Sequence, residues 1–234
     1  MTEVRRQLLE KLRRVFAIGV DRPLKAAGYR KQAFRYSRTI ADGLLHLVEV
    51  ERGRFPAPDE TEFTAICGAY LTLVWSVYPD SFDIGKPRES CCLVRSRIGF
   101  LGPERLDTWW SIKVKDSEAT LERMAHDLHR RFDDQVLPWL SKFDSAKAIG
   151  DYLVAPEKAP GRIRYPYREI VQGAHDLRNA AIAYFAGGDY TRAREILDLA
   201  AKTVGVATSQ KATAELRARL EQLIAEPREE RAKP

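Results

Sequence analysis

The stretch GYRKQAFRYSRTIADGLLHLVEVERGRF, residues 28–55, changes the periodicity of the chain from helical to strand-like. Apolar and polar residues alternate on both sides of Asp42-Gly43, and an Asp-Gly pair between alternating runs is a strong signal for a β-hairpin. We therefore predict two antiparallel strands, 29–40 and 44–55. The segment also holds six lysine and arginine residues, whose role is the first functional question that the sequence raises.

A two-residue turn at Asp42-Gly43 would pair Arg35 with Val50 and Lys31 with Arg54. Because side chains alternate between the two faces of a strand, one face would then collect four basic residues without an acid. These four residues are Lys31, Arg35, Arg52 and Arg54. A three-residue turn would reverse the facing of one strand, so this prediction depends on the turn.

Three interpretations of this basic cluster are open. It can be a solvated rim that salt screens, it can face the acidic segment PDETE at 58–62, or it can bind an anionic ligand or partner. Arg95 and Arg97 share one face of a later strand and would extend the cluster if that strand lies near it. Trp109 is a candidate stacking platform, with filling of the core as the alternative. The predicted binding residues are therefore Lys31, Arg35, Arg52, Arg54, Arg95, Arg97 and Trp109, with no metal ligand.

The remaining pattern predicts an α+β fold with an antiparallel sheet of about five strands flanked by helices. Residues 62–77 are long, apolar and rich in β-branched side chains, which favours a central strand, and further strands are expected at 89–100 and 109–114. The connections are too short for crossover helices, which argues for antiparallel pairing. Helices are expected at 3–20, in a short turn from Pro23 to Gly28, from Ser117 to about Pro138, and at 145–153.

The chain is expected to divide into a sheet domain at 1–153, a linker at 154–166, a helical C-terminal subdomain at 167–225 and a disordered tail at 226–234. Within the subdomain, three helices are expected at about 167–186, 189–204 and 209–225, as a helical hairpin followed by a capping helix. Residues 180–204 resemble one tetratricopeptide helix pair. A single such unit buries too little surface to stand alone, so we expect it to dock on the sheet domain or on a partner.

Charge is spread unevenly along the 234 residues, of which 44% are hydrophobic and 31% charged. Residues 1–40 contain eleven Lys and Arg against three acids, a net charge of +8, whereas the whole chain has a net charge of +6. The rest of the chain is therefore slightly acidic. This asymmetry favours an anionic partner near the N-terminus. Charged residues interrupt every apolar run, so neither a signal peptide nor a spanning helix is predicted. Three cysteines without ligand spacing fit a cytoplasmic protein with buried thiols.

A polar stripe on the helix predicted after Ser117 consists of Glu122, His126, His129 and Asp133, spaced i, i+4, i+7 and i+11. These are donors that zinc accepts, but one helix rarely supplies every ligand, and the spacing is not that of a zincin motif. We interpret the stripe as a half-exposed polar flank and predict no cofactor.

The sequence contains no Gly-rich phosphate loop, Gly-x-Ser-x-Gly elbow or Cys-x-x-Cys pair. We therefore favour a non-catalytic binding module with a protein partner or an anionic ligand. Association with nucleic acid through the basic N-terminal region is the alternative, and an enzyme with an unrecognised site is a third. Oligomeric state is not predicted.

The layout resembles the bacterial domain-of-unknown-function 4304 family over about residues 5–145. The resemblance rests on an opening helix with LKAAGYRKQAFRYSR, then DGLLHLVEVERGRF, EFTAICGAYL, CLVRSRIG and WWSI. The segment HLVEVERG is more acidic than that family's pattern. The resemblance implies a fold and a lineage but no activity.

Overall fold

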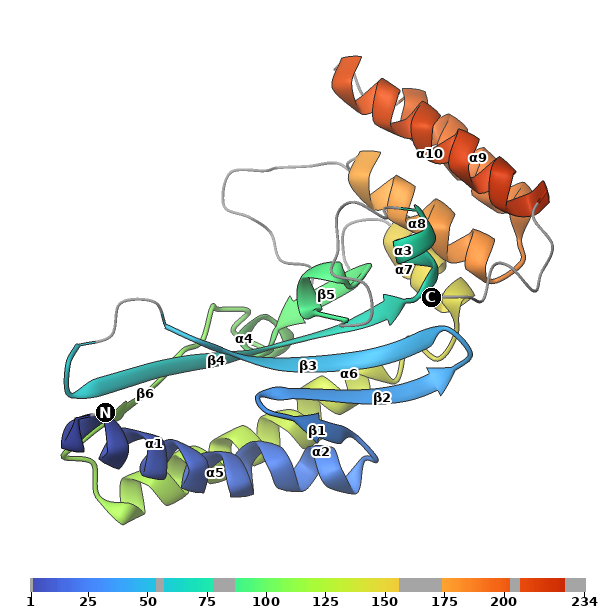
Figure 1. Ribbon diagram of the computed structural model, residues 1–234. Coiled ribbons are helices and arrows are strands. Elements are labelled where there is room, and N and C mark those ends of the chain that lie inside the picture. Colours follow the sequence, from blue (N-terminus) through green and yellow to red (C-terminus); the bar gives the residue numbers. More distant parts are fainter. Residues whose placement is uncertain (1, 54–56, 78–86, 156–173, 203–206, 226–234) are drawn as a thin grey trace.

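The computed structural model describes residues 2–53, 57–77, 87–155, 174–202 and 207–225 (Figure 1). It has the predicted α+β fold, with one antiparallel sheet of six strands. The strands are β1 (Arg30–Gln32), β2 (Arg35–Ala41), β3 (Leu44–Arg52), β4 (Glu60–Leu71), β5 (Val94–Arg97) and β6 (Trp110–Lys113). The helices are α1 (Glu3–Phe16), α2 (Arg22–Ala26), α3 (Leu73–Val77), α4 (Ile98–Leu101), α5 (Glu118–Arg131), α6 (Leu137–Leu140), α7 (Ala146–Val154), α8 (Ala174–Ala186), α9 (Tyr190–Lys202) and α10 (Ala207–Ala225).

Strand β4 is the centre of the sheet, as the sequence predicts. It pairs with β3 along one edge, and along its other edge with β6 near its start and β5 near its end. The predicted strand 62–77 is too long at its C-terminal side, because 73–77 form helix α3. The predicted strand 89–100 is likewise reduced to the four residues of β5, between the 3-10 turn η3 (Glu89–Cys91) and helix α4.

The first hairpin forms around Asp42-Gly43, with Gly43 at φ +70°, but its register differs from the predicted one. An irregularity between Thr39 and Ala41 shifts the pairing by one residue, so Arg35 faces Glu49 instead of Val50. A one-residue shift moves side chains to the other face of the sheet. The predicted strand 29–40 is also divided by a turn in which Ala33 has φ 57°. The added strand β1 therefore turns back, and Lys31 faces Tyr36 instead of Arg54.

One face of the sheet is covered by α1, α2, α5 and α6, which lie below it in Figure 1. The predicted apolar stripes of α1 and α5 are buried there, and Phe16 of α1 meets Phe63 of β4 edge to face at 4.9 Å. Ser117 caps α5 by accepting a hydrogen bond from the backbone N–H of Thr120, as predicted. We call the opposite side of the sheet the outer face.

Both long helices of this layer are interrupted by a π turn. The turn η1 (Ala17–Asp21) separates α1 from α2, and η4 (Phe132–Val136) separates α5 from α6. The two helices approach closely at Gly19, where an added Cβ would lie 2.8 Å from both the carbonyl oxygen of Ala125 and the Cβ of Leu128. The helix predicted at 3–20 is thus an α-helix followed by a π turn.

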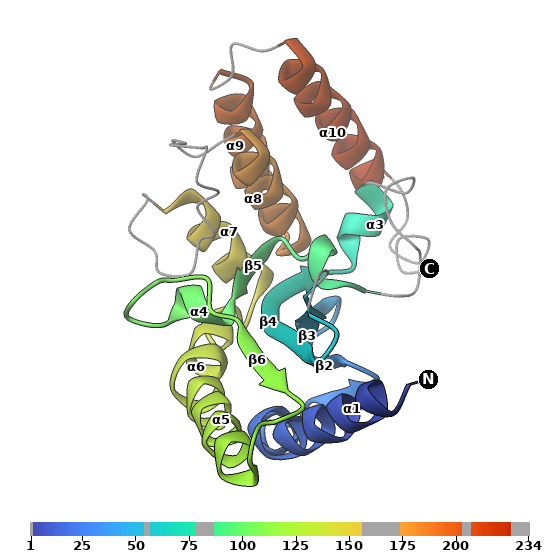
Figure 2. The same cartoon turned by 90° about the vertical axis from the view of Figure 1, so that its left-hand side faces the viewer.

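The C-terminal helices pack on the rest of the chain through α7 and α3 (Figure 2). Tyr184 of α8 donates a hydrogen bond of 2.7 Å to Asp151 of α7, and Arg219 of α10 donates one of 2.8 Å to the carbonyl of Ser76. Asp189 caps α9 by accepting a hydrogen bond from the backbone N–H of Arg192. The predicted linker lies almost wholly, and the predicted tail entirely, outside the described residues.

The three cysteines are free and buried, as predicted. Cys91 and Cys92 do not point to opposite faces of a strand, because they end a 3-10 turn, and both join Leu47 and Tyr70 in one small apolar cluster. No helix among the described residues is long and apolar enough to cross a membrane.

Candidate functional site

The outer face of the sheet brings together four of the seven predicted binding residues. Arg35 pairs with Glu49, Glu49 with Ile66, and Ile66 with Arg97, so these residues form one row across β2, β3, β4 and β5. Directly paired residues point to the same face, and residues two apart on one strand share it, which adds Arg95. Trp109 joins them, since the Arg97 guanidinium lies 5.3 Å from the centre of its ring.

This face is not basic, because each of its arginines has an acidic neighbour. Arg35 lies 3.1 Å from Glu49, and Arg95 lies 3.9 Å from Glu89. Arg97 contacts two carboxylates, Glu51 at 3.0 Å and Asp107 at 2.7 Å. Burial raises the pKa of Glu89, and the charge of Arg95 opposes that rise.

The predicted cluster of four basic residues without an acid is therefore wrong. Lys31 lies on β1 and pairs with Asp21 at 2.7 Å, and the Arg52 guanidinium stands 5.3 Å from the ring centre of Phe34. Arg54 lies outside the described residues. The physical reason is the turn at Ala33 together with the register shift near the hairpin, which place Arg35 opposite an acid.

The two adjacent tryptophans point to opposite faces of the sheet. Trp110 is 8% exposed and stacks on Phe63 at 5.9 Å in the core, whereas Trp109 is half-buried on the outer face. The ring of Trp109 is thus held against Arg97 at the margin of the sheet.

Leu106, three residues before this tryptophan in the chain, is a surface feature that sequence reasoning missed. Leu106 is 64% exposed and lies in the segment between α4 and β6. The backbone of the segment is braced against Gly99, where an added Cβ would lie 2.5 Å from the backbone nitrogen of Thr108. Arg105 has φ 49°, a conformation that non-glycine residues seldom adopt. A lone leucine within PERLD was the available signal.

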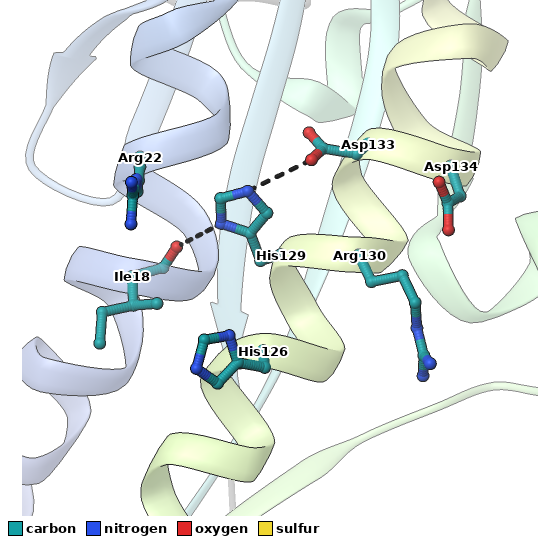
Figure 3. A pocket seen from close by; sticks show the side chains of 7 residues that line it. All are labelled: Ile18, Arg22, His126, His129, Arg130, Asp133 and Asp134. Carbon is teal, nitrogen blue, oxygen red and sulfur yellow. Dashed lines mark hydrogen bonds and ion pairs between the residues drawn. The ribbon is translucent and has the colours of Figure 1, made fainter.

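A second feature, which we call the histidine pocket, lies on the other side of the sheet, between η1 and the end of α5 (Figure 3). It has a volume of about 470 Å³. Three of the four residues of the predicted polar stripe line it, and Glu122 does not. The lining residues are Ile18, Arg22, His126, His129, Arg130, Asp133 and Asp134.

His129 connects the two π turns across this pocket. Its Nδ1 is 2.9 Å from the carbonyl oxygen of Ile18 in η1, and its Nε2 is 3.2 Å from Oδ2 of Asp133 in η4 (Figure 3). A carbonyl oxygen only accepts, so Nδ1 carries a hydrogen, and Nε2 faces the Asp133 carboxylate. Both nitrogens are thus occupied, so the ring is a cross-link and has no nitrogen left for a metal or a substrate.

Within the described residues, no group of three or more His, Cys, Asp or Glu side chains is arranged to hold a metal ion. His126, the second histidine of the pocket, is exposed and has no hydrogen-bond or ion-pair partner in the described part of the chain. The same holds for the side chain of Arg22. The pocket therefore offers two available donors beside an occupied His–Asp pair.

Comparison with known proteins places the sequence in a family without an assigned activity. No curated protein and no solved structure matches it. Residues 20–142, more than half of the 234-residue chain, match the family described as Domain of unknown function (DUF4304). These residues run from the end of η1 past η4 and include the corner of the outer face around Trp109 and all of the pocket lining except Ile18. The chain belongs to the DUF4304 family.

Proposed function

We propose that this protein is a non-catalytic binding protein and that it docks a partner protein at one corner of the outer face. This corner, which we call the corner patch, consists of Arg97, Leu106, Asp107 and Trp109. The observation that carries the proposal is the 64% exposure of Leu106 on a braced segment whose residues Asp107 and Trp109 both contact Arg97.

The residue types of the corner patch are those that contribute most to protein interfaces. Tryptophan and arginine are enriched among the residues that dominate binding energy. Burying Leu106 against a partner would contribute about 1.5–3 kcal/mol. Arg97 is held by two carboxylates and a ring before any partner arrives, so little side-chain freedom is lost on binding.

The charge of the patch favours a protein over a polyanion. Arg97 already contacts Glu51 and Asp107, so a phosphate backbone would meet carboxylates beside every guanidinium. A partner with an apolar pocket for Leu106 and both signs of charge around it complements this surface. We place the protein in the cytoplasm, because its three cysteines are free thiols.

A second candidate function, association with nucleic acid, is favoured by one observation. Four cationic side chains of the N-terminal segment, Arg5, Arg13, Lys25 and Arg30, are exposed and have no ion-pair partner in the part of the chain that the structure describes. Phosphate contacts release counterions, so such binding would weaken steeply with salt. If the protein binds neither DNA nor RNA even at low salt, this function is excluded.

The test of partner docking is affinity capture with the double variant Leu106→Glu/Trp109→Ala, which introduces a charge at the leucine and removes the indole ring. We expect the variant to fold, with an unchanged circular dichroism spectrum, and to lose the partner that the wild type retains after nuclease treatment. The matched control is Leu199→Glu, at a leucine of α9 that is 46% exposed. If both variants retain the same partner as the wild type, docking at the corner patch is ruled out.

A further inference from the structure

We infer that the histidine pocket binds the phosphate group of a small phosphorylated ligand, held by Arg22, His126 and Arg130. This site is separate from the corner patch, because the helices that form it cover the opposite side of the sheet (Figure 1). It therefore goes beyond the proposed docking function.

The donors come from two elements that face each other. Arg22 begins α2, and His126 lies in the middle of α5. Both side chains line the pocket and have no partner in the described residues. Arg130 lies 2.9 Å from Asp127, but its side chain remains 71% exposed and can reorient. A guanidinium supplies a fork of N–H donors, and charge-assisted bonds to phosphate are among the strongest hydrogen bonds.

The carboxylates of the pocket do not cancel this charge. Oδ2 of Asp133 faces Nε2 of His129 at 3.2 Å and not the donors Arg22 and His126. Figure 3 shows Asp134 on the far side of the pocket from Arg22 and His126. An anion between Arg22 and His126 would thus have the hydrogen-bonded His129–Asp133 pair as its inner wall.

Several separate donors suit a phosphate better than a carboxylate. A phosphate monoester carries about −1.5 to −2 charge near neutral pH and three strong acceptor oxygens. Arg22 and His126 approach such a group from two facing helices, and Arg130, which points away from them in Figure 3, joins them only by leaving Asp127. The volume of about 470 Å³ lies within the range of small-molecule sites and leaves room for an organic part. Asp134 can accept hydrogen bonds from the hydroxyl groups of that part, and Ile18 offers apolar contact.

The pocket is held in shape by contacts that do not need a ligand. Its two walls are the π turns η1 and η4, which His129 joins. Because Gly19 has no side chain, the backbone of η1 can lie directly against α5. π turns are frequent at functional sites, and donors fixed on rigid elements bind with less loss of freedom.

The test is titration of the full-length protein with inorganic phosphate, followed through the NMR signals of its histidine rings at fixed pH and ionic strength. We expect a saturable shift of His126 and a smaller one of His129. His46 and His175 should not move, because neither lines the pocket. Arg22→Ala should weaken the apparent affinity about tenfold or more, the effect of losing a bond to a charged group. Lys25→Ala, an equally exposed cation outside the pocket, should leave the affinity unchanged.

Several results would overturn the inference. These are a linear, non-saturating shift of His126, an equal response to sodium acetate, or equal losses in Arg22→Ala and Lys25→Ala. Glucose 6-phosphate should bind more tightly than inorganic phosphate, and equal or weaker binding contradicts an organic phosphate. If a short oligonucleotide shifts His126 and phosphate does not, nucleic acid is the ligand and a small phosphate is excluded. None of these outcomes bears on Leu106, so failure here is distinguishable from failure of partner docking.

Discussion

His46 illustrates at the scale of one residue how the sheet is joined to the helices. It is 3% exposed, its Nε2 lies 2.9 Å from the carbonyl oxygen of Phe143, and its Nδ1 lies 3.4 Å from the hydroxyl of Tyr29. Because a carbonyl only accepts, Nε2 donates and Nδ1 accepts, which describes a neutral ring. Burial lowers the pKa of His46, and the bond to Phe143 only partly opposes this effect.

This burial predicts that the protein loses stability as the pH falls. The unfolded chain binds a proton at His46 near pH 6.5, whereas the folded chain resists protonation until a lower pH. Below about pH 6.5 the unfolded state therefore holds more protons, and the free energy of unfolding falls by up to about 1.4 kcal/mol per pH unit until the folded pKa is reached. Urea unfolding from about pH 7 to about pH 5 measures this slope.

The control for this prediction compares two variants. His46→Gln should be less stable than the wild type at neutral pH but should show a flatter dependence on pH. His126→Gln, at an exposed ring, should keep the slope of the wild type. An unchanged slope in His46→Gln would assign the pH dependence to other groups.

Residue types and alternation predicted that certain arginines share one face of the sheet, but not which charges lie beside them. Arg35 and Arg97 were expected on a binding face, and both lie on the outer face, but each has an acid that the predicted register placed elsewhere. The shift near Thr39 and the positive φ of Ala33 depend on the packing of the whole sheet. No local motif in the sequence marks either feature, so the basic cluster could not be rejected from the sequence.

At the scale of elements, periodicity predicted the hairpin, the central strand and the helix capped by Ser117. It did not predict the π turns, because one widened turn disturbs an apolar stripe by only a single residue. Part of the histidine pocket could be predicted from the sequence. His126, His129 and Asp133 were expected on one stripe, whereas Arg22 and Ile18 come from an element about 110 residues earlier and enter only through tertiary packing.

Gly19 is predicted to be essential for the packing of α1 and η1 on α5. The substitution Gly19→Ala places a Cβ 2.8 Å from backbone and side-chain atoms of α5, so one helix must move. We expect a loss of about 1–3 kcal/mol in the free energy of unfolding despite the better helix propensity of alanine. Chemical denaturation measures it.

Gly187→Ala is the matched control, because its new Cβ would have no neighbour closer than 3.5 Å. It should change stability by less than about 1 kcal/mol. If the two substitutions change the free energy of unfolding equally, the close contact at Gly19 does not add to the effect of replacing a glycine.

At the scale of the whole molecule, the C-terminal helices and the sheet share one apolar core. Gly150 of α7 lies where a Cβ would be 3.0 Å from the ring of Tyr184 in α8. We therefore predict a single unfolding transition for the full chain. All four tryptophans precede residue 155, so their fluorescence reports unfolding of that part of the chain, while circular dichroism at about 222 nm also reports α8, α9 and α10.

The two signals should change at the same denaturant concentration in the wild type. In Gly150→Val, whose side chain presses on Tyr184, the helical signal should be lost first. Separate transitions in the wild type would show instead that the C-terminal helices are an independent unit, as the predicted domain division implies.

The enclosed sulfur atoms have a consequence for the chemistry of the folded chain. Burial raises the pKa of Cys67 and of Cys92, so the reactive thiolate is scarce at these positions, and Cys91 is only 7% exposed. An alkylating reagent must therefore wait for the sheet to open. The rate of cysteine alkylation then measures how often the sheet opens locally, so the three native thiols can report this opening without an added label.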